Sequence, residues 1–260
     1  MIVSILYSSL RVLTCQVSLS DLPWVPRSPH YPVLVTPIFD LSRKYAIDRV
    51  YAQIVRHLES DWPQTLSDWD KLERYIEFVT NNSNSGVERI DDHFPEPAAA
   101  IKLARQFDTS SILPAAFYHL SRLSVLDDWD KIHVDPSIAI RNPTNRTARW
   151  DLLSAQDFHC LLLGKAELAN FLRGCINATD LRHVTNIRMG VHCEVGMKQW
   201  KDIVDRCLQS ANALAVLKNS MQEGTNPNCC ICTNALKAKI ARVRGEIWEK
   251  LGDLFHLKNK

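Results

Sequence analysis

The stretch "ALKAKIARVRGEIWEKLGDLF", residues 235–255, decides the fold class of this chain. Its apolar residues recur every three or four positions, the spacing that places side chains on one face of an α-helix. These residues are Leu236, Ile240, Val243, Ile247, Leu251 and Leu254. The same spacing recurs through most of the 260 residues, and the alternation typical of β-strands is almost missing. The sequence therefore predicts an all-α, multi-helix array, with at most a short strand remnant at the N-terminus.

Upstream helices are predicted from the same periodicity and from local start signals. The predicted segments are 36–45, 46–58, 65–78, 96–107, 110–123, 153–163, 165–176 and 198–217. Pro37 and Pro114 suit first helical turns, where a missing N–H has no intrahelical partner. Ser154 and Asp157 have capping-box spacing, and Gly164 separates two of the predicted helices. Residues 81–95, rich in Asn and Ser, and residues 126–150 are predicted to be irregular.

Composition limits the classes of function. The chain has 31 basic and 29 acidic residues and a net charge of +2, which argues against a broad nucleic-acid-binding face. It contains neither glycine-rich nucleotide fingerprint, and no segment has the roughly 18 apolar residues of a membrane span. The apolar start "MIVSILYSSLRVLTCQ" has no basic residue before it and is broken by Ser4, Ser8 and Arg11, which argues against a signal peptide. We expect an intracellular protein, cytoplasmic or nuclear, without nucleic-acid or membrane partners.

Four segments, in this order, resemble the helical regions of a large fungal family of BTB/POZ-domain proteins. They are 41–70 ("LSRKYAIDRVYAQIVRHLESDWPQTLSDWD"), 98–124, 153–172 and 247–257 ("IWEKLGDLFHL"). The resemblance implies a truncated BTB-like remnant or irregular segment at 1–34 and BTB C-terminal-type helices at 35–80. A linker at 81–95 and a helical post-BTB region at 96–260 follow. The early strands and dimerising helices of a BTB core have no counterpart before residue 33.

The same resemblance implies a function in protein–protein interaction. BTB relatives include adaptors of cullin-based ubiquitin ligases, so a degenerate ligase adaptor or scaffold is the implied role, and the protein is expected not to be an enzyme. The surface that would bind a cullin-type ligase lies largely in the missing BTB core. The partner is therefore expected to be a protein whose identity the sequence does not specify.

The cysteines near the last helix allow two interpretations. Relatives in the family tend to carry cysteines at the positions of Cys193 and of Cys229-x-x-Cys232, and His192 stands beside the first. Three thiols and one imidazole are ligands of an acceptable type for tetrahedral zinc, so a zinc-stabilised structural or binding module is the alternative function. Packing as small buried apolar residues is the other interpretation, and it is the favoured one. No other cofactor is expected.

A second group of polar residues follows the helix predicted at 110–123. Asp127, Asp128 and Asp130, with His133 nearby, contain oxygen and nitrogen ligands that a metal could use. A solvated acidic loop explains the same residues, because loops collect Asp, and this interpretation is favoured.

Overall fold

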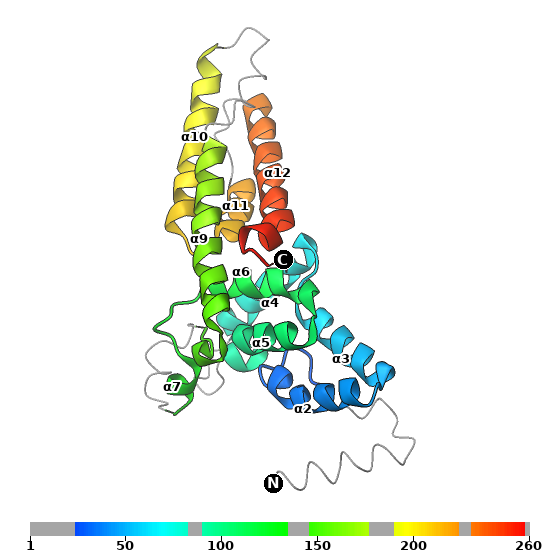
Figure 1. Cartoon of the computed structure of the whole chain (residues 1–260). Helices are drawn as coiled ribbons and strands as arrows, with labels where there is room; N and C mark the ends of the chain where they lie inside the picture. The colour runs from blue at the N-terminus through cyan, green and yellow to red at the C-terminus, as the bar shows by residue number, and fades with distance from the viewer. Residues whose placement is uncertain (1–23, 83–89, 135–145, 177–189, 224–229, 258–260) are drawn as a thin grey trace. The chain divides into compact units, whose positions relative to one another are not determined.

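A computed structural model describes residues 24–82, 90–134, 146–176, 190–223 and 230–257, without the side chains of 90, 134, 190–195 and 230–232. Over these ranges the chain forms helices and no strand, which confirms the all-α prediction (Figure 1). Within the same ranges, Asp128 and Ala148 form an isolated β-bridge. The strand remnant expected at the N-terminus lies outside the described residues. The chain divides into two compact units, one of 1–64, 68–112 and 125–153 and one of 65–67, 113–124 and 154–260.

The first unit is built around the packing of α2 (Tyr31–Lys44) on α3 (Asp48–Asp61) and α5 (Pro97–Phe107). Phe39 of α2 stacks on Phe107 at 3.9 Å between ring centroids and meets Tyr51 at 4.6 Å. The Tyr51 hydroxyl donates to the Phe107 carbonyl at 2.8 Å. The unit also contains most of α4 (Leu66–Asn82) and α7 (Trp129–Val134), together with the 3-10 turns η2 (Ile90–His93), η3 (Ser110–Ile112) and η4 (Trp150–Leu152).

The start of α2 corrects the sequence prediction. The helix begins at Tyr31 rather than near residue 36, Pro32 occupies its first turn, and Pro37 lies inside it. Burial of Tyr31 and Val35 explains the extension, because both side chains lose nearly all contact with water only if this turn is helical. Pro37 tolerates the interior position at the loss of one backbone hydrogen bond.

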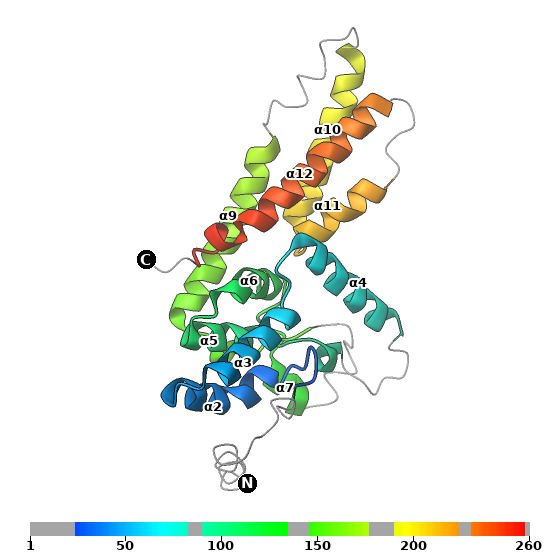
Figure 2. The ribbon, with the colours of Figure 1, turned by 90° about the vertical axis from the view of Figure 1, so that its right-hand side faces the viewer.

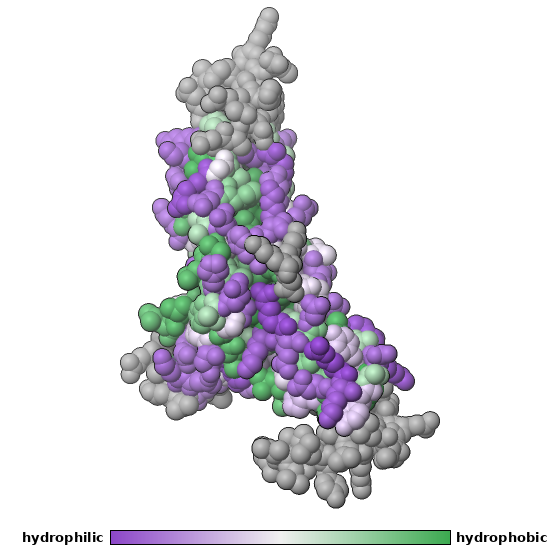
Figure 3. Space-filling view, in the orientation of Figure 1, coloured by the Kyte–Doolittle hydropathy of each residue, from purple (hydrophilic) through white to green (hydrophobic). Residues whose placement is uncertain are grey.

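The second unit contains α6 (Leu113–Ser121), α9 (Ala155–Ile176), α10 (Gly190–Gln209), α11 (Ala213–Gln222) and α12 (Cys230–Leu254). Helix α12 contacts each of the other four (Figure 2). Its predicted apolar side is buried at Leu236, Ile240, Val243, Ile247 and Leu251. In Figure 3 apolar residues fill the strip between α12 and the α9–α10 pair, while polar residues cover the outward faces of these helices. The periodicity of 235–255 therefore predicted the buried side correctly.

Helix α9 contains one correct prediction and one error. At its start, the Asp157 carboxylate accepts from the Ser154 N–H and hydroxyl, and the Asp157 N–H donates to the Ser154 hydroxyl oxygen, which confirms the capping pair. The predicted break at Gly164 is wrong, because α9 continues to Ile176. The glycine permits a close approach instead: a Cβ at this position would lie 1.9 Å from Cδ1 of Phe255.

Candidate functional site

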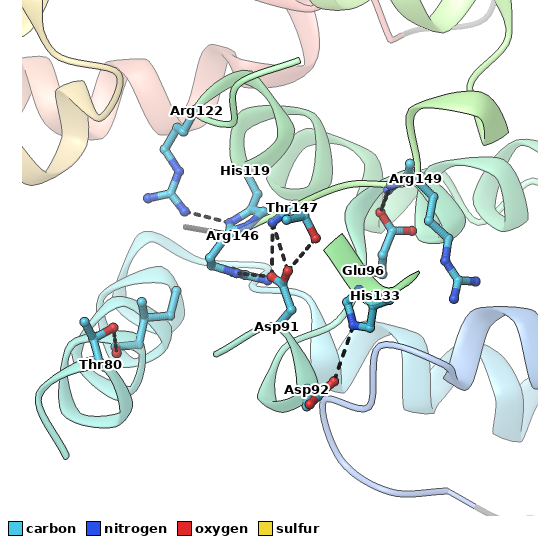
Figure 4. A network of polar contacts seen from close by, with 12 residues as sticks. Thr80, Asp91, Asp92, Glu96, His119, Arg122, His133, Arg146, Thr147 and Arg149 are labelled. Atoms are coloured by element: carbon cyan, nitrogen blue, oxygen red, sulfur yellow. Dashed lines mark hydrogen bonds and ion pairs between the residues drawn. The ribbon is translucent and has the colours of Figure 1, made fainter. Parts of the chain in front are cut away.

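A buried carboxylate, Asp91 in η2, fixes a distant part of the first unit. It accepts hydrogen bonds from the Thr147 N–H, at 3.0 Å to Oδ2, and from the Thr147 hydroxyl (Figure 4). The Arg146 Nε lies 3.6 Å from its Oδ1. Burial raises the pKa of Asp91, and Arg146 and the two Thr147 hydrogen bonds oppose that rise. The Asp91 carboxylate is therefore costly to bury and is compensated by Thr147, 56 residues away in sequence, together with Arg146.

A second buried carboxylate, Glu96, lies at the start of α5. It caps this helix by accepting from the N–H groups of Ala98 at 3.1 Å and Ala99 at 2.6 Å. It also accepts from the N–H of Arg149 at 3.0 Å. Burial raises the pKa of Glu96, and the N–H groups of Arg149, Ala99 and Ala98 oppose that rise. One side chain thus starts a helix and holds the 146–149 segment against it.

Trp129, at the beginning of α7, is enclosed by side chains of the same region. The His133 ring stacks on the indole at 3.9 Å, and its Nδ1 donates to the Trp129 carbonyl at 2.8 Å. The Arg149 guanidinium lies 5.1 Å from the centre of the indole. The His133 Nε2 lies 3.8 Å from the Asp92 carboxylate.

We refer to Asp91, Glu96 and their partners Arg146, Thr147 and Arg149 as the polar clamp. Both carboxylates accept backbone N–H groups, so their lone pairs hold chain segments together. This arrangement suits a rigid scaffold, because buried charges with satisfied hydrogen bonds resist rearrangement.

A second polar cluster anchors the first described residues to α3. Trp24 stacks on His57 at 4.5 Å, and the Tyr31 hydroxyl lies 2.8 Å from Nδ1 of His57. The Arg27 N–H donates to Oδ1 of Asp61 at 2.9 Å. Burial raises the pKa of Asp61 to about 6, against the hydrogen bond from the Arg27 N–H and the positive charge of Arg27. We call these five residues the N-terminal anchor.

A second apolar row of α2 lies beside its buried side. Leu34, Ile38, Leu41 and Tyr45 follow one another at helical spacing, in addition to Val33 and Pro37. Leu34 is 57% exposed and Tyr45 is 52% exposed, Ile38 and Leu41 are half-buried, and Val35 and Phe39 on the neighbouring side are buried. These six apolar residues are called the outer face of α2. Most amphipathic surface helices have a polar outer side, so a second apolar row requires an explanation.

The distances between the zinc ligands predicted from the cysteines do not follow from the described residues. His192 and Cys193 fall within α10 and Cys232 within α12, but their side chains, like the whole of Cys229, lie outside the described residues. The zinc site therefore remains a prediction. Across the described part of the chain, no group of three or more His, Cys, Asp or Glu side chains is placed to hold a metal ion.

The acidic group after α6 has local structural roles. The Asp128 carboxylate accepts from the Lys131 N–H at 3.0 Å at the start of α7. The Asp127 carbonyl accepts from the Trp150 indole at 3.1 Å, which ties this loop to η4. His133 contacts Trp129 and Asp92 instead of the neighbouring acids. These contacts give the group structural roles, but Asp130 and His133 lie in α7, so the segment predicted to be irregular over 126–150 contains a helix.

The sequence reasoning missed both carboxylates of the polar clamp because they lie in and just after a segment predicted to be a linker. Glu96 did carry a signal, since an acidic residue followed by Pro97 is typical of a helix start. For Asp91 there was no comparable signal, because its partners are distant in sequence.

Comparison with known proteins leaves the family unidentified. No family model, no curated protein and no solved structure matches this chain. Among the helices that the structure describes, none is long and apolar enough to cross a membrane.

Proposed function

We propose that this chain is a protein-interaction module that binds an amphipathic helix of a partner protein on the outer face of α2. The observation that carries the proposal is the apolar row of Leu34, Ile38, Leu41 and Tyr45 next to the buried side of the same helix. Leu34 and Tyr45 in this row are exposed, and the other two are half-buried. Contiguous exposed apolar patches mark interaction sites more often than chance. Partner helices bind such surfaces through residues spaced three and four apart.

The scaffold beneath this surface supports a binding role. Phe39, on the buried side of α2, is held between Tyr51 and Phe107, so the outer face is presented by a helix in fixed surroundings. Rigid presentation lowers the entropy cost of binding. The buried carboxylates of the polar clamp hold backbone groups, which fits a non-enzymatic scaffold.

The resemblance to fungal BTB/POZ proteins supports the same class of function. In this proposal the chain is a post-BTB helical module acting as a scaffold or degenerate ligase adaptor inside the cell, in the cytoplasm or nucleus. A cullin-type ligase subunit among the specific partners would extend the proposal to an adaptor role.

The test is quantitative capture of partners by the tagged full chain from a lysate of the source organism. Three baits are compared: the native chain, the double variant Leu34→Gln, Tyr45→Gln, and the matched control Phe78→Gln. Phe78 lies on α4 and is 64% exposed, so the control removes a similar apolar side chain elsewhere. A captured protein is then purified and its affinity measured by calorimetry. We expect the double variant to lose about tenfold or more in affinity and the control to lose little. Equal affinity for all three chains would refute the proposal.

A further inference from the structure

The turn that joins α6 to α7 is exposed and lies outside the helices. Helix α6 ends at Ser121, and α7 begins at Trp129. Between them Ser124 is exposed, and Val125 and Leu126 are 65% and 85% exposed. Modifying enzymes reach a folded chain on such turns, because the enzyme must surround the target side chain without unfolding a helix.

Acidic residues follow Ser124 at a spacing that three other described serines share. Among the serines that the structure describes, Ser67, Ser124, Ser154 and Ser220 have an acidic residue three positions later. Ser67 lies within α4, and Ser220 is buried within α11. The Ser154 hydroxyl donates to the Asp157 carboxylate at the start of α9. Of the four, Ser124 is the serine that lies on an exposed turn and takes no part in starting a helix.

The charge pattern on the C-terminal side of Ser124 is acidic. Asp127 and Asp128, three and four positions after it, are half-buried and so reach the surface. Arg122 is the one basic residue within three positions of Ser124, and its Nη2 lies 2.6 Å from Nδ1 of His119 (Figure 4). An enzyme that binds this turn therefore needs basic side chains, since acidic groups in its own site would repel the two carboxylates.

We propose that Ser124 is phosphorylated by a serine kinase that selects acidic substrates, with a nucleoside triphosphate as the phosphoryl donor. The Ser124 oxygen attacks the γ-phosphorus, the bond from that phosphorus to the β,γ-bridging oxygen breaks, and the nucleoside diphosphate leaves. The hydroxyl proton passes to the catalytic carboxylate of the kinase. Basic side chains of the kinase bind Asp127 and Asp128 and so position Ser124. This inference is independent of the surface on α2.

The test incubates the full native chain with Mg²⁺, ATP and a purified serine kinase that selects acidic substrates, and mass spectrometry measures the initial rate of phosphorylation at each serine. A kinase that selects basic substrates is run in parallel. We expect phosphate at Ser124 with the first kinase, a far lower rate with the second, and no phosphate at this position in Ser124→Ala. An unmodified Ser124, or a faster rate with the second kinase, would overturn the inference.

The native chain also contains its own comparison sites. Ser154 and Ser220 have the same spacing to an acidic residue, but their hydroxyls donate to the Asp157 carboxylate and the Val216 carbonyl. We therefore expect both to stay unmodified under conditions in which Ser124 reacts. A rate at either of them equal to the rate at Ser124 would show that exposure of the turn does not select the site, and it would overturn the inference.

Two matched single-charge variants test the recognition. Asp127→Asn removes a charge three positions after Ser124, and Asp130→Asn removes one six positions after it, within α7. We expect the rate at Ser124 to fall about tenfold in Asp127→Asn, because one charged contact with the kinase is lost, and less than about twofold in Asp130→Asn. Equal rates in the two variants would overturn the inference.

A third variant covers the case in which Asp127→Asn disturbs the fold, which a lowered melting temperature would reveal. In Asp128→Asn the amide oxygen can still accept from the Lys131 N–H at the start of α7. We expect the same loss of rate at Ser124 as in Asp127→Asn. A native rate in a variant that melts like the native chain would overturn the inference.

Discussion

Substituting Gly164 by alanine should destabilise the second unit, against the usual effect of this change in a helix. An alanine Cβ would lie 1.9 Å from Cδ1, 2.3 Å from Cε1 and 2.5 Å from Cγ of Phe255. Phe255 is fully buried and meets Phe117 at 5.9 Å between ring centroids, so its ring cannot move without disturbing the core. The contact must be relieved by a shift of the ring or of the end of α12.

Two free-energy terms of opposite sign decide the outcome. Alanine gains about 1 kcal/mol over glycine in a helix interior. Overpacking a filled core costs about 1–3 kcal/mol, and so short a contact belongs at the upper end of that range. The net loss in the free energy of unfolding is therefore about 2 kcal/mol, which corresponds to a fall in Tm of roughly 5–10 °C for a unit of this size.

The assay is urea unfolding followed by circular dichroism, with Gly174→Ala as the matched control. Gly174 lies on the same helix, α9, and its added Cβ would have no atom within 4 Å, so this variant should gain up to about 1 kcal/mol. In the Gly164→Ala background, Phe255→Leu should cost less than it does alone, because the smaller side chain makes room for the methyl group. The reasoning is refuted if Gly164→Ala is as stable as Gly174→Ala.

Three further predictions concern the two polar clusters and the cysteines. Burial raises the pKa of Asp61 from 3.8 to about 6, so its contribution to stability is present at low pH and is lost as the pH rises through 6. In urea titrations, Asp61→Asn should therefore be more stable than the native chain at pH 7.5, by at most about 3 kcal/mol, and equal to it near pH 4. Glu96→Gln places an amide NH₂ among backbone donors and should cost about 1–3 kcal/mol, with faster hydrogen exchange at the start of α5; unchanged exchange would contradict this role. If Cys193, Cys229 and Cys232 bind zinc, the dialysed chain should hold one zinc per molecule by elemental analysis, and Cys229→Ser with Cys232→Ser should remove it and lower Tm, whereas a metal-free chain would assign these thiols to packing.

The helices with the strongest periodicity could be predicted because one local property, the spacing of apolar residues, determines both their type and their buried side. The row from Leu236 to Leu254 is the clearest case, since five of its six predicted residues are buried and the last, Leu254, is half-buried. The start of α9 was predictable for a similar reason, because Ser154 and Asp157 satisfy each other's backbone groups within four residues.

Two errors lie where a distant contact outweighs a local signal. A third, the single helix predicted over 198–217, breaks locally, because α10 ends at Gln209 and Asn212 caps α11. Gly164 was predicted to end a helix, but Phe255, far along the chain, occupies the space that a side chain would need. Pro37 was predicted to begin a helix, but burial of Tyr31 starts α2 earlier. Local signals reflect the free-energy cost of a backbone conformation, and the free energy gained by tertiary packing can be larger than that cost.

The sequence by itself determined the all-α class, most of the helix positions and the buried row on α12, because these depend on spacing along one chain segment. Only the tertiary structure decided which apolar row is buried and which is exposed, since α2 has two such rows and its neighbours α3 and α5 cover one. It also paired Asp91 with Thr147 and Glu96 with Arg149 across more than fifty residues. Such pairs form only when folding removes both partners from water together, and no local pattern records that event.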